Sequence, residues 1–373
     1  MIQRTLFDLI SKKLFSGKTI LLLGPRQVGK TTLIKQVFMA NPEKPVWLNA
    51  DNPDDRELLN TINSTRAKEL FKPRMLVIID EAQRLENSGL SLKIIHDSCP
   101  EVQLIATGSS AFELTDKIKE SMTGRKWTFT LYPISFRELI GHMNKAELLR
   151  MVETRLVYGS YPEVINHAGN EREILYELIS DYLYKDIFRI KEIRKPDLVE
   201  KLVKSLAFQI GNEVSNRELS NMLQADKETI ERYLYLLEEA YIIFRLPSFS
   251  GNLRNELKRS KKIYFVDNGI RNAVINLFNP VSLRNDTGAL WENLMISERR
   301  KVNEYNRQFC NTYFWRTTSQ LEIDYLEEAD GVLHAFEFKW RPPSKTAIPE
   351  TFLSAYPGSD FKVVTKDNFW EFC

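Results

Sequence analysis

The feature that most constrains the fold of this chain is the segment Gly24–Thr31, which matches the phosphate-binding pattern G-x-x-x-x-G-K-T/S at every specified position. The apolar run 19–23 before it is typical of a buried strand, and residues 32–38 after it have the spacing of a helix start. A glycine loop between a strand and a helix N-terminus wraps phosphate oxygens in backbone N–H groups. We therefore expect an α/β domain that binds a nucleoside triphosphate.

Two side chains of this loop have specific expected roles. Lys30 is predicted to reach the β- and γ-phosphates and so to count among the catalytic residues, and the Thr31 hydroxyl is predicted to ligate Mg²⁺. The expected nucleotide-binding residues of the loop are Gly24, Pro25, Arg26, Gln27, Val28, Gly29, Lys30, Thr31 and Thr32.

Two acids follow a second apolar strand and complete the predicted site. The run 75–79 is hydrophobic throughout, as expected for a strand covered on both faces, and it leads into Asp80 and Glu81. Acids at the carboxyl end of such a strand lie where open α/β sheets bind ligands. We assign Asp80 to Mg²⁺ and Glu81 as the general base that polarises the attacking water. The alternative is an acid pair that favours the first turn of a helix.

Two further positions are candidates for sensing or stabilising the transferred phosphate. A third strand, 102–107, leads into Ser109 and Ser110, and a polar residue there is expected to touch the γ-phosphate; an ordinary helix N-cap is the alternative. Arg125 precedes the strand 127–131, and an arginine there is a candidate for stabilising transition-state charge, in cis or from a neighbouring subunit. A solvated surface arginine explains Arg125 equally well.

Together these motifs resemble the AAA-type ATPases, and more specifically a prokaryotic family of AAA ATPases that carries a C-terminal domain of unknown function. The resemblance extends over nearly the whole chain and rests on Gly24–Thr32, Ile79–Gln83, Thr107–Ser110, Leu131–Glu138, Tyr158–Glu163, Tyr184–Ile187 and Lys262–Gly269. It implies ATP as the nucleotide, with hydrolysis. No helical lid with a sensor arginine follows the core directly, which leaves ring assembly and oligomeric state open.

Length and composition predict several domains in a reducing compartment. A chain of 373 residues is too long for one core, and we expect domains at 1–135, 136–275 and 276–373. The three cysteines, Cys99, Cys310 and Cys373, form no C-x-x-C pair, which excludes a zinc finger and favours the cytoplasm. No segment reads as a signal peptide or a membrane span. The net charge of +2 leaves nucleic-acid binding undecided.

The middle of the chain predicts a helical region with a winged-helix-like part. Residues 214–223 read as a helix, 224–226 as a turn and 227–240 as a second helix, with 241–246 and 262–266 as strands of a wing. Four acids on the second helix argue against reading DNA with it. The wing is basic instead and offers a surface for double-stranded DNA. Its cations are Arg254, Lys258, Arg259, Lys261 and Lys262.

The last hundred residues hold a second chemical motif. Asp324 precedes Glu337 by thirteen residues on a predicted hairpin, and Lys339 follows Glu337 by two. This resembles the D…(D/E)-x-K motif of restriction-endonuclease-like domains, with Glu292 as the acid on the preceding helix. Such acids would hold Mg²⁺ while Lys339 helps to activate water. The alternative is a hairpin with cross-strand ion pairs.

The sequence therefore predicts an α/β P-loop ATPase domain with a parallel sheet, a helical and winged-helix-like region, and a nuclease-like α/β tail, using ATP and Mg²⁺. One hypothesis is an ATPase coupled to DNA through the wing and the tail. A second is a nucleotide-dependent switch that binds protein partners and whose tail is inactive. A third is that ATP only stabilises the fold, with no turnover.

Overall fold

The structure is a computed structural model, and its described residues form two compact units. One unit comprises Met1–Pro133 with Glu239–Tyr241, and the other comprises Ile134–Glu238 with Ile242–Cys373. The middle and tail regions predicted from the sequence thus belong to one unit. The structure describes residues 2–40, 45–108, 121–141, 143–180, 193, 195–250, 261–317, 319–342 and 349–373.

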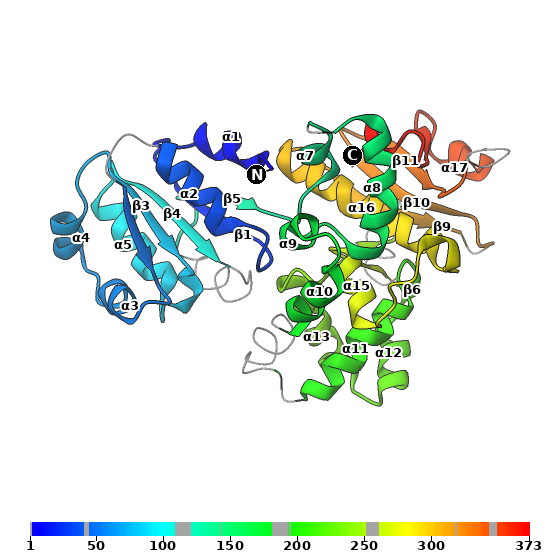
Figure 1. The fold of residues 1–373 in the computed structure, drawn as a ribbon, viewed down its shortest axis with the longest axis horizontal. Coiled ribbons are helices and arrows are strands. Elements are labelled where there is room, and N and C mark those ends of the chain that lie inside the picture. Colours follow the sequence, from blue (N-terminus) through cyan, green and yellow to red (C-terminus); the bar gives the residue numbers. More distant parts are fainter. Residues whose placement is uncertain are drawn as a thin grey trace. The chain divides into compact units, whose positions relative to one another are not determined.

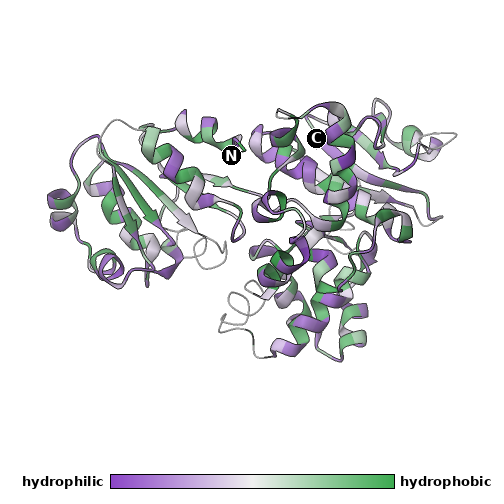
Figure 2. Cartoon of the chain, in the orientation of Figure 1, coloured by the Kyte–Doolittle hydropathy of each residue, from purple (hydrophilic) through white to green (hydrophobic). Residues whose placement is uncertain are grey.

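A five-stranded parallel sheet forms the centre of unit 1 (Figure 1). Its strands are β1 (Thr19–Leu23), β2 (Val46–Asn49), β3 (Leu76–Asp80), β4 (Gln103–Gly108) and β5 (Lys126–Thr130). The order is β2-β3-β4-β1-β5, and each neighbouring pair is parallel. Every residue of β1, β3 and β4 is buried, which explains their continuous hydrophobic runs, green in Figure 2.

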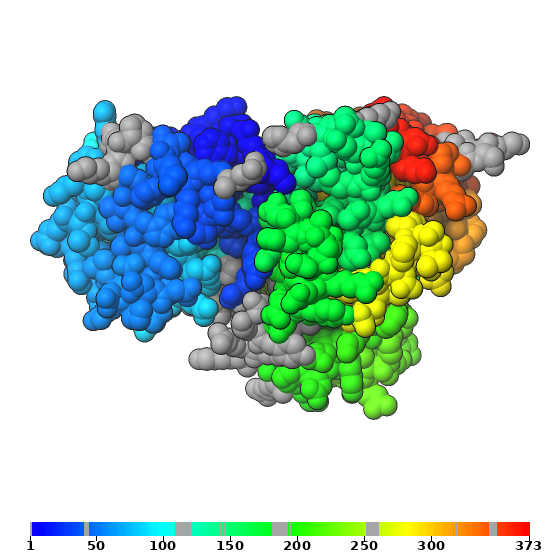
Figure 3. Space-filling model, viewed as in Figure 1, coloured from blue at the N-terminus to red at the C-terminus, as the bar shows by residue number. Residues whose placement is uncertain are grey.

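The helices of unit 1 begin where the sequence supplies caps. Asn52, Asn63 and Asn87 each accept a hydrogen bond from a backbone N–H of the first turn that follows. Residues 30–40 and 45–60 form part of the outer surface of this unit, blue in Figure 3. The helical elements are α1 (Leu6–Ser11), α2 (Lys30–Ala40), α3 (Pro53–Asn60), α4 (Ser64–Leu70), η1 (Ala82–Arg84) and α5 (Ser88–Ser98).

The strand order creates a crevice for a ligand between β1 and β4. From β1 the chain passes to β2 at one edge of the sheet, whereas the strand after β4 is β5 at the opposite edge. When the connections that follow two adjacent parallel strands run to opposite edges of the sheet, a crevice forms at the carboxyl ends of those strands. Open α/β sheets bind ligands in this crevice. The loop after β1, the end of β3 and the end of β4 meet at this edge.

The first part of unit 2 is helical, as predicted. Asp267 begins α15 by accepting hydrogen bonds from the backbone of Gly269 and Ile270, and it also accepts one from the Ser160 N–H at 2.7 Å. This buried carboxylate thereby ties two sequence motifs together. The helices are α7 (Phe136–Ile140), α8 (Lys145–Tyr158), α9 (Pro162–Asn166), α10 (Glu171–Ile179), α11 (Pro196–Phe208) and α15 (Asn268–Val274).

The predicted helix pair and strands of the middle region are present. Helices α12 (Asn216–Leu223) and α13 (Lys227–Glu239) are followed by β7 (Ile243–Pro247) and β8 (Lys261–Phe265). A short strand β6 (Glu213–Val214) completes a three-stranded sheet of order β6-β8-β7. Residue 214 therefore belongs to a strand and not to the first helix, which starts after the Ser215 cap.

A long helix and a mixed sheet form the C-terminal part of unit 2. The sheet order is β12-β11-β10-β9, with β11 and β12 parallel and the other pairs antiparallel. No helix among the described ranges is long and apolar enough to cross a membrane. The elements are η3 (Val281–Leu283), α16 (Thr287–Tyr305), β9 (Asn311–Arg316), β10 (Glu322–Ala329), β11 (Val332–Phe338), α17 (Glu350–Ala355), β12 (Asp360–Val364) and η4 (Phe369–Glu371).

Candidate nucleotide-binding site

The loop between β1 and α2 needs both of its glycines. Gly24 has φ +141°, and a Cβ there would collide with the carbonyl oxygen of Leu131, whose own N–H bonds Leu23 at 2.8 Å. Gly29 has φ +94°, a conformation that L side chains rarely adopt. The glycines of the phosphate-binding pattern are therefore dictated by close packing at one end of the loop and by backbone geometry at the other.

Lys30 is folded back over the loop that precedes it. Its Nζ donates to the carbonyl oxygens of Gly24 at 2.8 Å and of Pro25 at 2.6 Å, and the residue is 6% exposed. These two carbonyl groups carry no net charge, so neither of them neutralises the ammonium. This places the charge beside the first residues of the loop, where the sequence predicts the phosphates.

Asp80 at the end of β3 is bonded both to α2, which follows the loop, and to β4. One carboxylate oxygen accepts from the Thr31 hydroxyl at 3.2 Å, and the other accepts from the Thr107 hydroxyl. Asp80 is 5% exposed. A carboxylate next to a threonine hydroxyl is an oxygen donor set of the kind that Mg²⁺ prefers. These residues therefore fit a magnesium ion held by Thr31 and Asp80, as the sequence predicts.

Glu81 is held in a specific and uncommon backbone conformation. It has φ 55° and ψ 40°, a left-handed geometry that is unusual for a residue other than glycine. Its N–H donates to the Thr107 hydroxyl at 3.2 Å, and its carboxylate accepts from the Gln83 amide at 2.5 Å. Strained residues of this kind persist where the surroundings hold them and often mark functional sites.

Thr107 is the site residue that the sequence reasoning missed. It contacts both Asp80 and the backbone of Glu81, so it is the polar residue of the third strand that reaches the acids. The predicted candidates, Ser109 and Ser110, lie outside the described residues. The available signal was a polar residue that follows the apolar run 104–106, at a position predicted to belong to the strand.

Arg125 does not lie near the loop. It immediately precedes β5, and its carbonyl accepts from the Thr19 N–H at the start of β1, whereas the loop follows the end of β1. Five strand residues span roughly 16 Å. The guanidinium instead pairs with Asp97 at 2.9 Å. Within one chain the structure therefore does not bring Arg125 together with Lys30, and only the role from a neighbouring subunit stays a prediction.

Arg4 is a second residue that the sequence reasoning missed. It is 7% exposed, and its guanidinium donates to the carbonyl of Val28 in the loop and to that of Tyr132 after β5, both at 2.6 Å. Charge-assisted bonds of this length are strong, and the planar guanidinium fixes their directions. Arg4 therefore ties the loop to the end of the sheet, and no sequence motif points to such an arginine.

The acids predicted in the C-terminal tail do gather, but with two lysines among them. We call Glu292, Glu322, Asp324 and Glu337 the acid cluster. Burial raises the pKa of Glu292 to about 7, even though Lys262 and hydrogen bonds oppose the shift. Burial also raises the pKa of Asp324 and of Glu337, and at Glu337 the charge of Asp324 adds to it. The acids thus affect one another as neighbours.

Lys262 lies inside this cluster and not on a basic surface. Its Nζ is 2.9 Å from Glu292 Oε1 and 2.5 Å from Glu322 Oε1, and the residue is 2% exposed. Burial disfavours its ammonium, but the charges of Glu292, Glu322 and Asp324 outweigh burial and raise the pKa of Lys262. At Glu292, Asp324 and Glu337 burial dominates instead, because it outweighs the charges of Lys262 and Lys339 that favour the ionised carboxylates.

The prediction that Lys262 belongs to a basic DNA-binding wing is wrong. Lys262 is buried and paired with acids, so its ammonium group is not available to the phosphate backbone of DNA. Arg254, Lys258 and Arg259 lie outside the described residues, and Lys261 begins β8 in a half-buried position. The acids of α13 also differ from expectation, because Glu231 and Glu238 both pair with Arg245 of β7.

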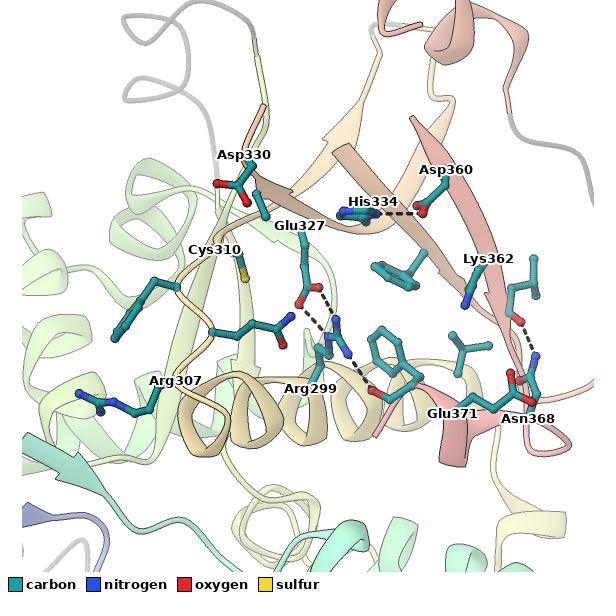
Figure 4. Close-up of a pocket in the computed structure, with 17 residues that line it drawn as sticks. Arg299, Arg307, Cys310, Glu327, Asp330, His334, Asp360, Lys362, Asn368 and Glu371 are labelled. Carbon is teal, nitrogen blue, oxygen red and sulfur yellow. Dashed lines mark hydrogen bonds and ion pairs between the residues drawn. The ribbon is translucent and has the colours of Figure 1, made fainter. Parts of the chain in front are cut away.

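A cavity of about 530 Å³ lies elsewhere in the C-terminal part of unit 2 (Figure 4). Arg299 on α16 donates to both oxygens of Glu327, at 2.8 and 2.6 Å, and His334 pairs with Asp360 at 2.9 Å. Figure 4 shows these pairs within the lining. The lining thus contains both acidic and basic side chains, and Arg299 and Glu327 neutralise each other.

Comparison with known proteins identifies the class of each region. Residues 16–140 match the family model described as an AAA domain. Residues 149–281 and 287–370 match two models that are each described as a domain of unknown function, DUF8612 and DUF4143. The chain therefore carries an AAA-type P-loop ATPase domain followed by these two domains. This confirms the AAA part of the resemblance and does not test the nuclease-like part.

The relatives of the whole chain are uncharacterised. The chain is 26% identical over 342 residues to the uncharacterised protein Rv2008c of Mycobacterium tuberculosis, covering 88% of this chain and 72% of that protein. It is equally identical over 342 residues to MJ1544 of Methanocaldococcus jannaschii, covering 85% and 74%. The solved Walker-type ATPase PABY2304 of Pyrococcus abyssi is 16% identical with a TM-score of 0.50, covering 74% of this chain and 96% of that chain. At that identity the likeness concerns the fold alone.

Proposed function

We propose that this chain binds Mg-ATP at the Gly24–Thr31 loop and hydrolyses it. The observation that carries the proposal is the bonding of Asp80 to the hydroxyls of both Thr31 and Thr107 at the carboxyl edge of the sheet. This joins the phosphate-binding loop to the acids at one crevice. Adenine as the base rests on the AAA-domain match.

Each residue of the site has a distinct role in this proposal. A bound Mg²⁺ neutralises phosphate charge and orients the β- and γ-phosphates. Lys30 exchanges its two carbonyl partners for phosphate oxygens. Glu81 accepts the proton of the attacking water, and the Gln83 amide and the Thr107 hydroxyl hold Glu81 in place for that role. Ser109 and a neighbouring chain's Arg125 remain proposed helpers that report or stabilise the γ-phosphate.

The test is the rate of phosphate release from Mg-ATP in wild type and in Glu81→Gln, with and without duplex DNA. We expect Glu81→Gln to lower turnover by about 100-fold or more while it still binds nucleotide. Glu86→Gln is the matched control, because Glu86 is an exposed acid in the same region. Wild-type turnover that is absent, with ATP binding intact and a raised melting temperature, would instead support ATP as a stabilising ligand only.

The same measurement addresses what hydrolysis drives. We propose coupling to DNA through unit 2, and the order α11, β6, α12, α13, β7, β8 supports a winged-helix-like region there. The alternative is a nucleotide-dependent switch for a protein partner. Turnover that rises with DNA and loses this rise at high salt favours the first, since phosphate contacts weaken steeply with salt. Turnover that is indifferent to DNA favours the second.

Two finer points complete the proposal. The free cysteines Cys99, Cys310 and Cys373 support a reducing compartment such as the cytoplasm. The packing of α16 with the mixed sheet β9 to β12 supports a restriction-endonuclease-like fold for the tail. The proposal does not include metal-dependent cleavage of nucleic acid by the tail, because acids of the predicted metal site are paired with lysines.

A further inference from the structure

The acid cluster of unit 2 is more than a surface hairpin with ion pairs. Its members come from α16 (Glu292), β10 (Glu322 and Asp324) and β11 (Glu337), so three elements direct carboxylates to one place. Asp324 is 8% exposed, and burial raises its pKa and those of Glu292 and Glu337. Carboxylates gathered out of water in this way need a cation to neutralise them.

Lys262 supplies that cation from a separate sheet. The Nζ of Lys262 touches Glu292 and Glu322 directly, at 2.9 and 2.5 Å, and its stem passes near the Phe314 ring, with the Nζ 5.5 Å from the ring centre. An ammonium group has three donors and no acceptor, so carboxylates are its natural partners. The position that joins the helix acid to the hairpin acids is therefore filled by the chain itself.

Each of the three predicted metal ligands has at least one carboxylate oxygen that is already engaged by the chain. Glu292 Oε1 accepts from the Tyr264 hydroxyl at 2.6 Å as well as from Lys262. Asp324 Oδ2 accepts from the Phe338 N–H at 2.8 Å, and Glu337 Oε1 is 2.5 Å from the Nζ of Lys339. Within the described ranges, no three His, Cys, Asp or Glu side chains are placed to hold one metal ion. The donor set as folded does not fit a divalent cation.

We propose that Lys262 takes the place of a metal ion in the acid cluster, which makes the cluster a metal-independent ionic joint between the β6-β8-β7 sheet and the C-terminal sheet. Lys262 lies on β8 of the first sheet, and Glu322 lies on β10 of the second. The two sheets also meet where the Phe249 N–H donates to the Phe314 carbonyl at 2.6 Å. A divalent ion enters this cluster only when the ammonium is removed.

The experiment is a titration of the nucleotide-free full-length protein with Mn²⁺, followed by calorimetry and by thermal melting. Wild type is expected to bind no Mn²⁺ at the acid cluster. Lys262→Met is expected to bind Mn²⁺ at least about tenfold more tightly and to gain a melting shift with the ion, because the uncompensated carboxylates attract it. Adding Asp324→Asn to Lys262→Met is expected to abolish this gain, which assigns the ion to the cluster.

Two control variants distinguish the replaced cation from a general effect. Lys261→Met changes the neighbouring lysine of β8 and is expected to behave as wild type. Lys262→Arg keeps a cation and is expected to exclude Mn²⁺. Wild-type binding of Mn²⁺ that Asp324→Asn removes would overturn the proposal, even if Lys262→Met failed to fold. A folded Lys262→Met that binds Mn²⁺ no better than wild type would overturn it as well.

Discussion

Lys30 in one unit and Lys262 in the other are both buried among oxygen atoms, and the nature of those oxygens differs. Lys30 in unit 1 is bound by two neutral backbone carbonyls, at 2.8 and 2.6 Å. Lys262 in unit 2 is bound by two carboxylates, at 2.9 and 2.5 Å. Both residues are nearly inaccessible to water. The geometry of the two ammonium groups is therefore similar, while their electrostatic settings are opposite.

The chemical difference between these partners indicates which of the two lysines is available to bind a phosphate group. An ammonium held by carbonyls can exchange those partners for a phosphate, because the attraction between two full charges exceeds that between a charge and a carbonyl dipole. An ammonium held by carboxylates is already neutralised, and removing it would leave buried charges unpaired. Lys30 is therefore available to a nucleotide, whereas Lys262 holds the fold together.

The largest expected effect is on stability and should separate the two lysines. Lys262→Met removes the cation that contacts both Glu292 and Glu322, leaving Glu322 paired only with Arg316, and breaking a buried pair in this way costs about 3 to 5 kcal/mol. We expect the free energy of unfolding in urea to fall by that amount, with Lys261→Met as the matched control. Lys30→Met should cost less, about 1 to 3 kcal/mol, because the carbonyl partners that it loses at Gly24 and Pro25 are uncharged. Equal losses at both positions would break the comparison.

The second effect is on ATP turnover, and here Lys30→Met should have a larger effect than Lys262→Met. Lys30→Met removes the charge that is proposed to contact the phosphates, and we expect turnover of Mg-ATP to fall about 100- to 1,000-fold. Lys35→Met, an exposed lysine on the same helix, is the control. Lys262→Met that remains folded should retain wild-type turnover. Phosphate release under saturating Mg-ATP provides the measurement, and a normal rate in Lys30→Met would contradict the assigned site.

The third effect is a pH dependence that belongs to the acid cluster. The pKa of Glu292 is raised to about 7, so the folded protein holds a proton there that the unfolded chain releases near its usual value of 4.5. The stability from this group is full below about 4.5 and is lost as the pH rises through 7. Relative to Glu292→Gln, wild type should lose about 1 to 3 kcal/mol between pH 5 and pH 7.5. Parallel stability curves for the two proteins would refute the shift.

The fourth effect concerns Thr107, which holds both acids of unit 1. Thr107→Val removes the hydroxyl that bonds Asp80 and the Glu81 backbone while it keeps the shape of the side chain. We expect turnover to fall about tenfold, with nucleotide affinity changed by less than about twofold, because binding relies on the loop. Thr61→Val, an exposed threonine at the end of α3, serves as the comparison. A loss of affinity as large as the loss of turnover would place Thr107 in binding instead.

The smallest effect is expected at Arg125. Because this residue lies at the amino edge of the sheet and pairs with Asp97, Arg125→Ala should leave turnover within about twofold of wild type in dilute protein. Turnover should be measured over a range of protein concentrations. A loss that appears only as the concentration rises would support a role between subunits, whereas a loss at every concentration would contradict the position of Arg125 in this structure.

Much of unit 1 was predictable because its signals are local in sequence. A glycine pattern between an apolar strand and a helix indicates the loop, and a run such as 75–81 indicates a buried strand that ends in acids. Parallel strands place their carboxyl ends at one edge of a sheet, so Lys30, Thr31 and Asp80 were expected to meet there. Thr107 was not expected, since its role depends on which strand lies between β1 and β3.

The sequence by itself determined the elements, the phosphate-binding loop and the acids of both units, because each depends on residues close together in the chain. Only the tertiary structure decided that Arg4 reaches the loop and that Lys262 lies within the acid cluster. It also decided that Arg125 lies at the amino edge of the sheet, opposite to the phosphate-binding loop. These outcomes depend on contacts between residues distant in sequence and on the balance between burial and charge. The sequence alone does not show whether a basic side chain will contact phosphate, carbonyl or carboxylate oxygens. These contacts determine the function of the residue.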